Sequence, residues 1–418
     1  MRRHQFEAYL EKVFDWPTLV AALPEGRQHP QHDWKKVFDA VFLGSACQFG
    51  PVHRIEAECC RGALQKRIGP ISEDTIGYAL QRQDVEPVFE LGCVVARQLK
   101  RNGVLRSSWS RGRVVAAVDG IEICSSYSRC CAACLQREVE RKLDGEVQKC
   151  IQFYHRISAV TVVSTPFPIF LGIRFQEPGE TEVACSLALL KELSVRLGRR
   201  FIDTLVADAI YLQKPFVGEL EALGGLEWVI NLKENQPNLL SEAERLTNRP
   251  ADHVQTSAQG ELSLWHLPQV DWPVADRLIR VVKTVRVQNT RQVRVEDPDG
   301  ERKKTKEPVP VRSTNFYATN VELGTIPPLF IHELGRSRWT IDAQVFQTIT
   351  MDCHLKQPSV HQDSALVVLT SIRCLAFTLA ILFYHRQVRS HCRTSPISFC
   401  EMARQFAYSF LAVGINSS

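Results

Sequence analysis

Apolar and polar positions in the middle of the chain alternate in runs that predict β-strands. Residues 113–124 form an apolar, β-branched run with a carboxylate and a glycine toward its end, a pattern typical of a buried strand. Residues 201–211 repeat this pattern after a predicted amphipathic helix over residues 179–198. We expect Asp119 at the end of the first strand and Asp208 at the end of the second, where a carboxylate can leave the core and face a ligand.

Further strands and helices around these two runs complete an α/β pattern. Residues 154–164 and 167–175 predict two strands that follow the first in an antiparallel meander. Residues 214–223 predict a short helix, and residues 226–233 a fifth strand. The order three strands, helix, strand, helix, strand is typical of a ribonuclease-H-like domain, in which the ends of the first and fourth strands lie side by side. We therefore predict an α/β, ribonuclease-H-like core whose first part spans residues 109–248.

The first 108 residues predict a helical N-terminal domain. Helices are expected over residues 6–14 and 34–49, after residue 72, and over 85–101. Ser72 is a candidate N-cap, and Asn102 with Gly103 is a typical helix end. Such a domain either binds DNA ends or simply packs against the core. We favour DNA binding because of four basic side chains, Arg61, Lys66, Arg67 and Arg82.

A β-rich insertion is predicted over residues 249–326. Its expected strands are residues 263–267, 277–287, 292–296 and 309–319. A turn over residues 297–300 joins two of them. This stretch is the most basic part of the chain, with Arg280, Lys283, Arg286, Arg291, Arg294, Arg302, Lys303, Lys304 and Lys306. The run of charge predicts either a solvated face or a DNA contact, and the sequence leaves both open.

Residues 327–418 return to helix and carry the last core helices and a C-terminal tail. Helical patterns cover residues 328–342 and 343–354. The apolar stretch 364–386 is long enough to be mistaken for a membrane span, but Arg373 interrupts it near the middle. We interpret it as a buried helix of a soluble protein.

Composition and charge restrict the function classes only loosely. The chain has 418 residues, 44% of them hydrophobic and 23% charged, as in an ordinary globular protein with room for two or three domains. A net charge of +5 permits an acidic partner without requiring one. The 14 cysteines are scattered, and the start of the chain has no apolar leader segment, so we expect a reducing, cytoplasmic compartment.

Four short stretches together resemble a known family. They are residues 118–120, 206–211, 228–233 and 338–342. In these stretches the chain is similar to bacterial insertion-sequence transposases of the DDE type, of the insertion-sequence-four-like kind with a β-rich subdomain inserted before the last catalytic helix. The resemblance covers about residues 110–390.

This resemblance implies a DNA transposase that cleaves the ends of an insertion sequence and transfers the strands. In such enzymes three carboxylates hold two divalent ions, Mg²⁺ or Mn²⁺, that assist an in-line displacement at phosphorus. The corresponding acids here are Asp119, Asp208 and Asp342, with Asp119 bridging both ions. Arg338 is expected to hold a phosphate of the transposon end in a bidentate manner.

The implied partners are the terminal inverted repeats and the target DNA, bound by a homodimer in the bacterial cytoplasm at the nucleoid. Besides Arg338, the expected DNA contacts are Lys233, Arg280, Lys283, Arg286, Lys303 and Lys304.

The chain departs from the family signature around the third acid. The signature is Tyr-x2-Arg-x3-Glu-x6-Lys, and this chain has Gly335, Arg338, Asp342 and Ile349 at those places. Asp342 keeps the charge of the glutamate but is one methylene shorter. These changes support a second hypothesis, a decayed transposase that binds DNA without turnover. A third hypothesis is a metal-dependent nuclease with an RNA substrate.

Cys131 and Cys134 have the spacing of zinc ligands, and His155 is near in sequence, as are Cys124, Cys130 and Cys150. The pair falls in the connection between the first two predicted strands. Because a second Cys-x-x-Cys pair is missing, we favour ordinary reduced cysteines over a zinc knuckle.

Overall fold

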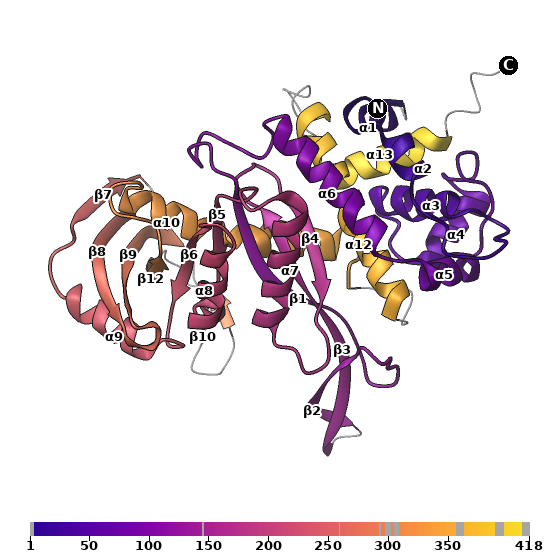
Figure 1. Ribbon diagram of the computed structural model, residues 1–418. Coiled ribbons are helices and arrows are strands. Elements are labelled where there is room, and N and C mark those ends of the chain that lie inside the picture. Colours follow the sequence, from indigo (N-terminus) through magenta and orange to yellow (C-terminus); the bar gives the residue numbers. More distant parts are fainter. Residues whose placement is uncertain are drawn as a thin grey trace. The chain divides into compact units, whose positions relative to one another are not determined.

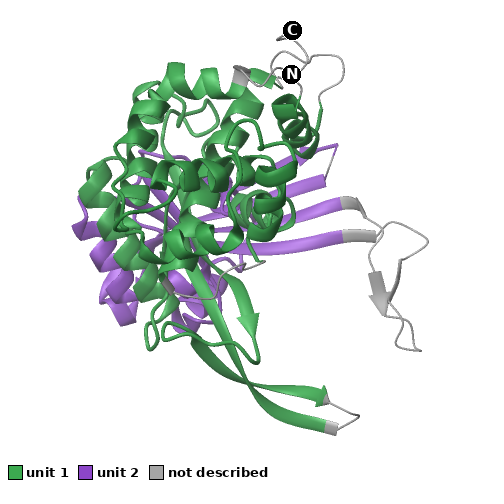
Figure 2. Cartoon of the chain, turned by 90° about the vertical axis from the view of Figure 1, so that its right-hand side faces the viewer, with its two compact units in different colours: residues 1–201, 339–418 green, residues 202–338 purple. Residues whose placement is uncertain are grey.

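The computed structural model describes residues 4–143, 146–258, 260–291, 294–296, 302–304, 309–356, 363–388 and 397–411. The chain folds into two compact units, coloured separately in Figure 2. The first unit contains residues 1–201 and 339–418, and the second contains residues 202–338. The architecture is mixed α/β, as predicted, whereas the four-part domain division proposed from the sequence stays a prediction.

The first unit contains an antiparallel sheet. Its strands are β1 (Val115–Ser126), β2 (Leu135–Leu143), β3 (Glu146–Val162) and β4 (Ile169–Phe175). β3 pairs with β1, β2 and β4, each time antiparallel (Figure 1). The predicted meander of three strands is therefore confirmed as β1, β3 and β4. The strand β2 was not predicted.

Helices make up the rest of the first unit. They are α1 (His4–Phe14), α2 (Trp16–Ala21), α3 (Trp34–Ala46), α4 (Val52–Arg61), α5 (Glu73–Arg82), α6 (Glu86–Arg101), α7 (Glu182–Leu197), the π-helix η3 (Ile341–Phe346), α11 (Gln347–Met351), α12 (Asp363–Phe383), the π-helix η4 (Tyr384–Val388) and α13 (Phe399–Leu411). Two predicted helix ends are confirmed. The Ser72 side chain accepts the Thr75 N–H and caps α5, and α6 ends at Asn102. α7 contacts β1, β3 and β4 and so packs on the sheet.

The long apolar helix α12 forms the centre of the helical core. It contacts α3, α5, α6 and β4, and 94% of its most apolar window, within residues 364–388, is buried, as predicted for a core helix. By length and composition alone this helix could also cross a membrane. Arg373 is 2% exposed and donates from Nη2 to the Gly50 carbonyl at 2.8 Å. Burial lowers the pKa of Arg373 to about 10, so the side chain stays a cation at neutral pH.

The second unit is built on a mixed sheet. Its strands are β5 (Thr204–Ala207), β6 (Glu227–Leu232), β7 (His253–Ser257), β8 (Gly260–Trp272), β9 (Arg277–Arg291) and β12 (Val309–Thr319), in the spatial order β5-β6-β12-β9-β8-β7. β5 and β6 run parallel, and the other pairs are antiparallel. Thus β12, from the predicted insertion, extends the same sheet as β6.

Short helices and one small ladder complete the second unit. They are η1 (Ala209–Tyr211), α8 (Lys214–Ala222), α9 (Pro237–Leu246), η2 (Pro273–Ala275), α10 (Pro328–Ser337) and the paired strands β10 (Arg294–Glu296) and β11 (Arg302–Lys304). α10 contacts β5, β6, β8, β9 and β12 and so lies across the sheet. The turn predicted over residues 297–300 lies outside the described residues.

Candidate active site

Asp208 directly follows the parallel strand β5. The four residues of β5 are buried, whereas Asp208 is half-buried and precedes η1. The predicted strand over residues 201–211 is therefore shorter than expected, but the position of Asp208 at a strand end is confirmed. Ala207 pairs with Ile230, so β5 and β6 end at the same edge of the sheet. Ligands of open α/β sheets usually bind beyond this edge.

Side chains in β6 and just after it hold the Asp208 carboxylate. Asn231 Nδ2 and Lys233 Nζ donate to Oδ1 at 3.1 and 3.0 Å. Burial raises the pKa of Asp208, but hydrogen bonds from the Ala209 N–H, Asn231 and Lys233 more than offset this effect. The charge of Arg338 also lowers this pKa, which ends below its ordinary value. Asp208 is therefore ionised at neutral pH.

Arg338 caps the C-terminal end of α10 and is only 5% exposed. Its positive charge lowers the pKa of Asp208, which lies in the same unit. A guanidinium that is buried in this way supports a neighbouring carboxylate. The contact with a DNA phosphate that the resemblance implies for Arg338 stays a prediction.

Asp119 lies inside β1 and not at its end, which corrects the expectation from the sequence. The strand continues to Ser126 because residues 119–122 keep their ladder pairing with residues 156–159 of β3. Burial nevertheless changes at this point: residues 115–118 are buried, and Asp119 and Gly120 are half-buried. The Gly120 N–H donates to Asp119 Oδ1 at 2.9 Å.

Glu182 is a second acid beside Asp119 that sequence reasoning did not single out as a site residue. A Cβ added to Gly120 would lie 2.7 Å from Glu182 Cδ, so the carboxylate packs against the glycine backbone. Arg156 Nη1 donates to Glu182 Oε2 at 2.7 Å. The sequence signal is the glycine after Asp119, because only glycine leaves space for this carboxylate.

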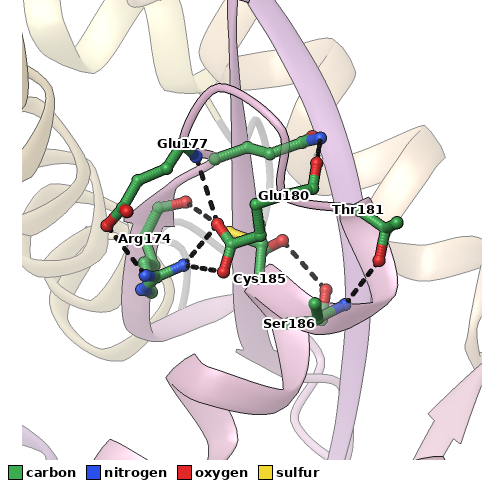
Figure 3. A network of polar contacts seen from close by, with 9 residues as sticks. Arg174, Glu177, Glu180, Thr181, Cys185 and Ser186 are labelled. Atoms are coloured by element: carbon green, nitrogen blue, oxygen red, sulfur yellow. Dashed lines mark hydrogen bonds and ion pairs between the residues drawn. The ribbon is translucent and has the colours of Figure 1, made fainter. Parts of the chain in front are cut away.

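A polar network fixes the turn that brings Glu182 to this place (Figure 3). Arg174 Nη1 donates to both carboxylate oxygens of Glu180 at 2.7 Å, and Nη2 donates to Glu177 at 3.0 Å. The Thr181 side chain accepts the Ala184 N–H and caps α7. Hydrogen bonds thus hold the turn between β4 and α7 at both of its ends.

Asp342 lies in the first turn of the π-helix η3 and is half-buried. π-Helical turns are rare and often mark functional positions, because the wider turn changes the direction of its side chains. η3 contacts β1 within the first unit, so Asp119 and Asp342 come from two packed elements that are far apart in sequence.

The structure thus places Asp119 and Asp342 in one unit, and Asp208, Lys233 and Arg338 in the other. The meeting of the three acids around divalent ions stays a prediction. Within the described residues, the group of side chains whose ligand atoms lie close enough to hold a metal is a different one, Cys131, Cys134 and His155.

Two of the predicted DNA contacts, Lys233 and Arg280, bind other residues of the second unit. Lys233 is 55% exposed and forms the ion pair with Asp208. Arg280 is 5% exposed and donates to His266 Nε2 at 2.9 Å and to the Ile326 carbonyl at 2.9 Å. Burial lowers the pKa of Arg280. Arg280 is therefore a structural residue, and we remove it from the proposed DNA contacts.

The other predicted contacts lie on β9 and β11. Lys283 is half-buried, donates to Thr247 Oγ1 at 3.0 Å and lies 5.0 Å from the Trp265 ring centre. Burial, and then the charge of Arg336, lowers the pKa of the half-buried Arg286. Two neighbouring cations favour an anion, so Arg336 joins Arg286 as a candidate phosphate contact. The side chains of Lys303 and Lys304 lie outside the described part of the chain.

The departures from the family signature have structural counterparts. A Cβ on Gly335 would lie 2.2 Å from Tyr317 Cε1, so the ring of Tyr317 fills the space beside this glycine. Ile349 is completely buried in α11. The described structure therefore has no room for the signature tyrosine at position 335, and a lysine at position 349 would bury its charge.

The sequence matches no known family model, and no curated protein matches it. Among solved structures, the chain is similar to the piggyBac transposase in a cryo-EM structure of its synaptic complex with hairpin DNA. The TM-score is 0.44 and the sequence identity 11%, over 98% of this chain and 79% of that chain. A likeness of this extent carries no argument about the fold or function of this chain.

Proposed function

We propose that the chain is a DDE-type DNA transposase, a metal-dependent nuclease and strand transferase that acts on the ends of an insertion sequence. The observation that carries the proposal is the environment of Asp208. Its carboxylate stands at the end of a parallel strand and is kept ionised by Asn231, Lys233 and Arg338. The signature-like stretches around Asp119 and Asp342 supply the other two acids.

This set of donors fits a hard divalent cation. Mg²⁺ and Mn²⁺ prefer carboxylate oxygens, and Asp119, Asp208 and Asp342 would provide them. When bound, two such ions lower the pKa of an attacking water and stabilise the leaving oxygen in an in-line displacement at phosphorus.

The surrounding residues orient these acids and hold DNA. Asn231 fixes the rotamer of Asp208 through its hydrogen bond. Lys233 neutralises the carboxylate and, being 55% exposed, is free to turn toward a phosphate when a metal replaces it. Arg286 and Arg336 would hold the DNA backbone, and we expect a homodimer to hold two ends together, by analogy with strand transfer in general.

A decayed transposase that binds DNA without turnover is the second candidate. Three observations favour it: the shorter acid Asp342, the glycine at position 335 that Tyr317 packs against, and the buried Ile349. A catalytic site loses activity when one ligand is displaced by about 1 Å. DNA cleavage separates the two candidates.

The test is cleavage of DNA that carries the ends flanking this gene, in Mg²⁺ or Mn²⁺, with an RNA of the same sequence as a second substrate. We expect Asp119→Ala and Asp208→Ala to reduce cleavage at least 100-fold, and Asp342→Glu to keep or raise it. The exposed Asp276, in the turn before β9, provides the control Asp276→Asn, which should cleave like the native protein.

The outcomes distinguish the hypotheses. End binding without cleavage, unchanged in Asp342→Glu, would identify a binding relic. Cleavage that survives both alanine substitutions would overturn the assignment of the acids. Cleavage confined to the RNA would favour a ribonuclease.

A further inference from the structure

The side chains of Cys131, Cys134 and His155 converge on one point in the first unit. Cys131 Sγ lies 3.5 Å from Cys134 Sγ and 3.2 Å from His155 Nε2, and Cys134 Sγ lies 3.3 Å from the same nitrogen. Cys134 and His155 are buried, with 4% and 2% exposure, and Cys131 is half-buried. Three soft or borderline ligand atoms therefore face one another at the edge of the core.

The spacing of these atoms is close to that of a tetrahedral zinc site. With Zn–S near 2.3 Å and Zn–N near 2.05 Å, tetrahedral angles put two sulfurs about 3.8 Å apart and a sulfur and nitrogen about 3.6 Å apart. The observed distances are shorter by a few tenths of an ångström. A small outward rotation of the side chains would thus admit an ion.

The backbone around the cysteines supports this arrangement. The Cys134 N–H donates to the Cys131 carbonyl at 3.2 Å and closes a tight turn. The Cys131 N–H points back to Cys134 Sγ at 3.3 Å, which stabilises negative charge on that sulfur. His155 comes from β3, where it pairs with Cys124 of β1, so its ring is held by the sheet.

We propose that Cys131, Cys134 and His155 bind one Zn²⁺ ion, with the fourth position open to water or another exogenous ligand. Binding requires both thiols as thiolates and a neutral imidazole, so two thiol protons pass to the solvent as the metal–sulfur bonds form. The site uses other ligand atoms than the proposed carboxylate chemistry.

The location of the site indicates a structural role. It joins the loop between β1 and β2 to β3, at the base of the hairpin formed by β2 and β3. Residues 153–162 of β3 pair with β1, whereas residues 146–152 have β2 as their one partner among the described strands. This two-stranded arm extends from the rest of its unit (Figures 1 and 2). Because isolated two-stranded hairpins are only marginally stable, a metal at the base would hold the arm in place.

The experiment uses the full-length chain purified under reducing conditions. Metal analysis should find about one zinc per chain, and Co²⁺ added after zinc removal should give the thiolate charge-transfer band and the strong visible absorption of a tetrahedral site. Cys131→Ser with Cys134→Ser should abolish both signals. Cys150→Ser, which removes a half-buried thiol on β3 outside the group, should leave them unchanged.

A variant that replaces one metal-binding side chain by another distinguishes loss of zinc binding from loss of the fold. His155→Cys should retain zinc and strengthen the sulfur-to-cobalt band. In the native chain, removal of zinc by a chelator should speed up hydrogen exchange of residues 135–143. No tetrahedral cobalt spectrum in the native chain would overturn the proposal. So would a proteolytic peptide containing both Cys131 and Cys134 whose mass is lower by about 2 Da, because that marks a disulfide between them in place of a metal site.

Discussion

Asp208 and His332 show how the second unit sets the charge of single residues in opposite ways. Asp208 is half-buried and keeps its negative charge because hydrogen-bond donors and a guanidinium surround it. His332 is 5% exposed, and its Nδ1 lies 3.1 Å from Thr284 Oγ1. Burial, and then the charges of Arg336 and Arg286, lowers the pKa of His332 to about 4. His332 is therefore neutral at physiological pH.

His332 should make the second unit sensitive to acid. The folded state takes up its proton only near pH 4, whereas the unfolded chain does so near pH 6.5, so the unfolded state gains protons first as the pH falls. The contribution of neutral His332 is fully present above pH 6.5 and is lost as the pH falls to 4, by up to roughly 3 kcal/mol.

Urea unfolding from pH 7 to pH 4 should be less steeply pH-dependent in His332→Gln than in the native chain. The exposed His253 provides the control His253→Gln, which should follow the native curve. Equal slopes for all three proteins would contradict the assigned environment.

At the scale of single residues, the candidate site could be predicted only in part, because a local sequence pattern does not show which residues pack beside a side chain. Asp119 and Asp208 were proposed because each follows an apolar strand pattern, and the order of such acids is visible in sequence. Glu182 and Arg336 were missed because their relevance depends on which residues pack beside them in the fold. Arg280 was misassigned because a basic residue in a strand pattern does not reveal whether its guanidinium faces solvent or backbone carbonyls.

At the scale of elements, helices with clear end signals were predictable, whereas α4, α9 and α13 were not predicted, and strands were predictable only where one side is buried. α5 and α6 begin and end near their predicted limits because Ser72 and Asn102 carry local signals. β2 was missed because most of its residues are charged or polar, and its backbone is ordered by pairing with β3. The expected end of β1 at Asp119 was wrong because the ladder with β3 continues past this residue.

The packing of α10 on the sheet depends on a glycine. In Gly335→Ala the new methyl would collide with the Tyr317 ring at 2.2 Å, and we expect a loss of about 1–3 kcal/mol in the free energy of unfolding. The matched control is Gly218→Ala in α8, where a Cβ meets nothing within 4 Å and a gain of about 0.5–1 kcal/mol is expected. Denaturant unfolding measures both. Equal effects of the two substitutions would mean that Tyr317 moves aside freely.

At the scale of the whole molecule, the first unit is assembled from both ends of the chain, with the second unit inserted between residues 201 and 339. The insertion separates Asp342 from Asp119 in sequence, and Asp342 was proposed as the third acid only from the resemblance to a known family. Asp342 follows a long β-rich stretch, and the packing of η3, which carries Asp342, on β1 is a property of the fold and not of a local pattern.

Binding of divalent ions should be visible in the thermal stability of the whole protein. A ligand at 100 times its Kd stabilises the folded state by about 2.7 kcal/mol. If the acids hold metal, Mn²⁺ should raise the Tm of the native chain by a few degrees and leave the Tm of Asp119→Ala nearly unchanged. Asp276→Asn should respond like the native chain. An identical rise in Asp119→Ala would place the ion elsewhere.

The charged side chains of β2 made this strand hard to predict from the sequence. The same side chains protect the protein from self-association. Among the described strands β2 pairs with β3 and no other, so its outer edge presents unpaired backbone groups. Such edges are templates for aggregation unless charged side chains make the approach of another strand unfavourable. Arg137, Glu138, Glu140, Arg141 and Lys142 line this strand. Replacing them with apolar residues would produce a more regular strand pattern and, at the same time, a chain that is prone to precipitate.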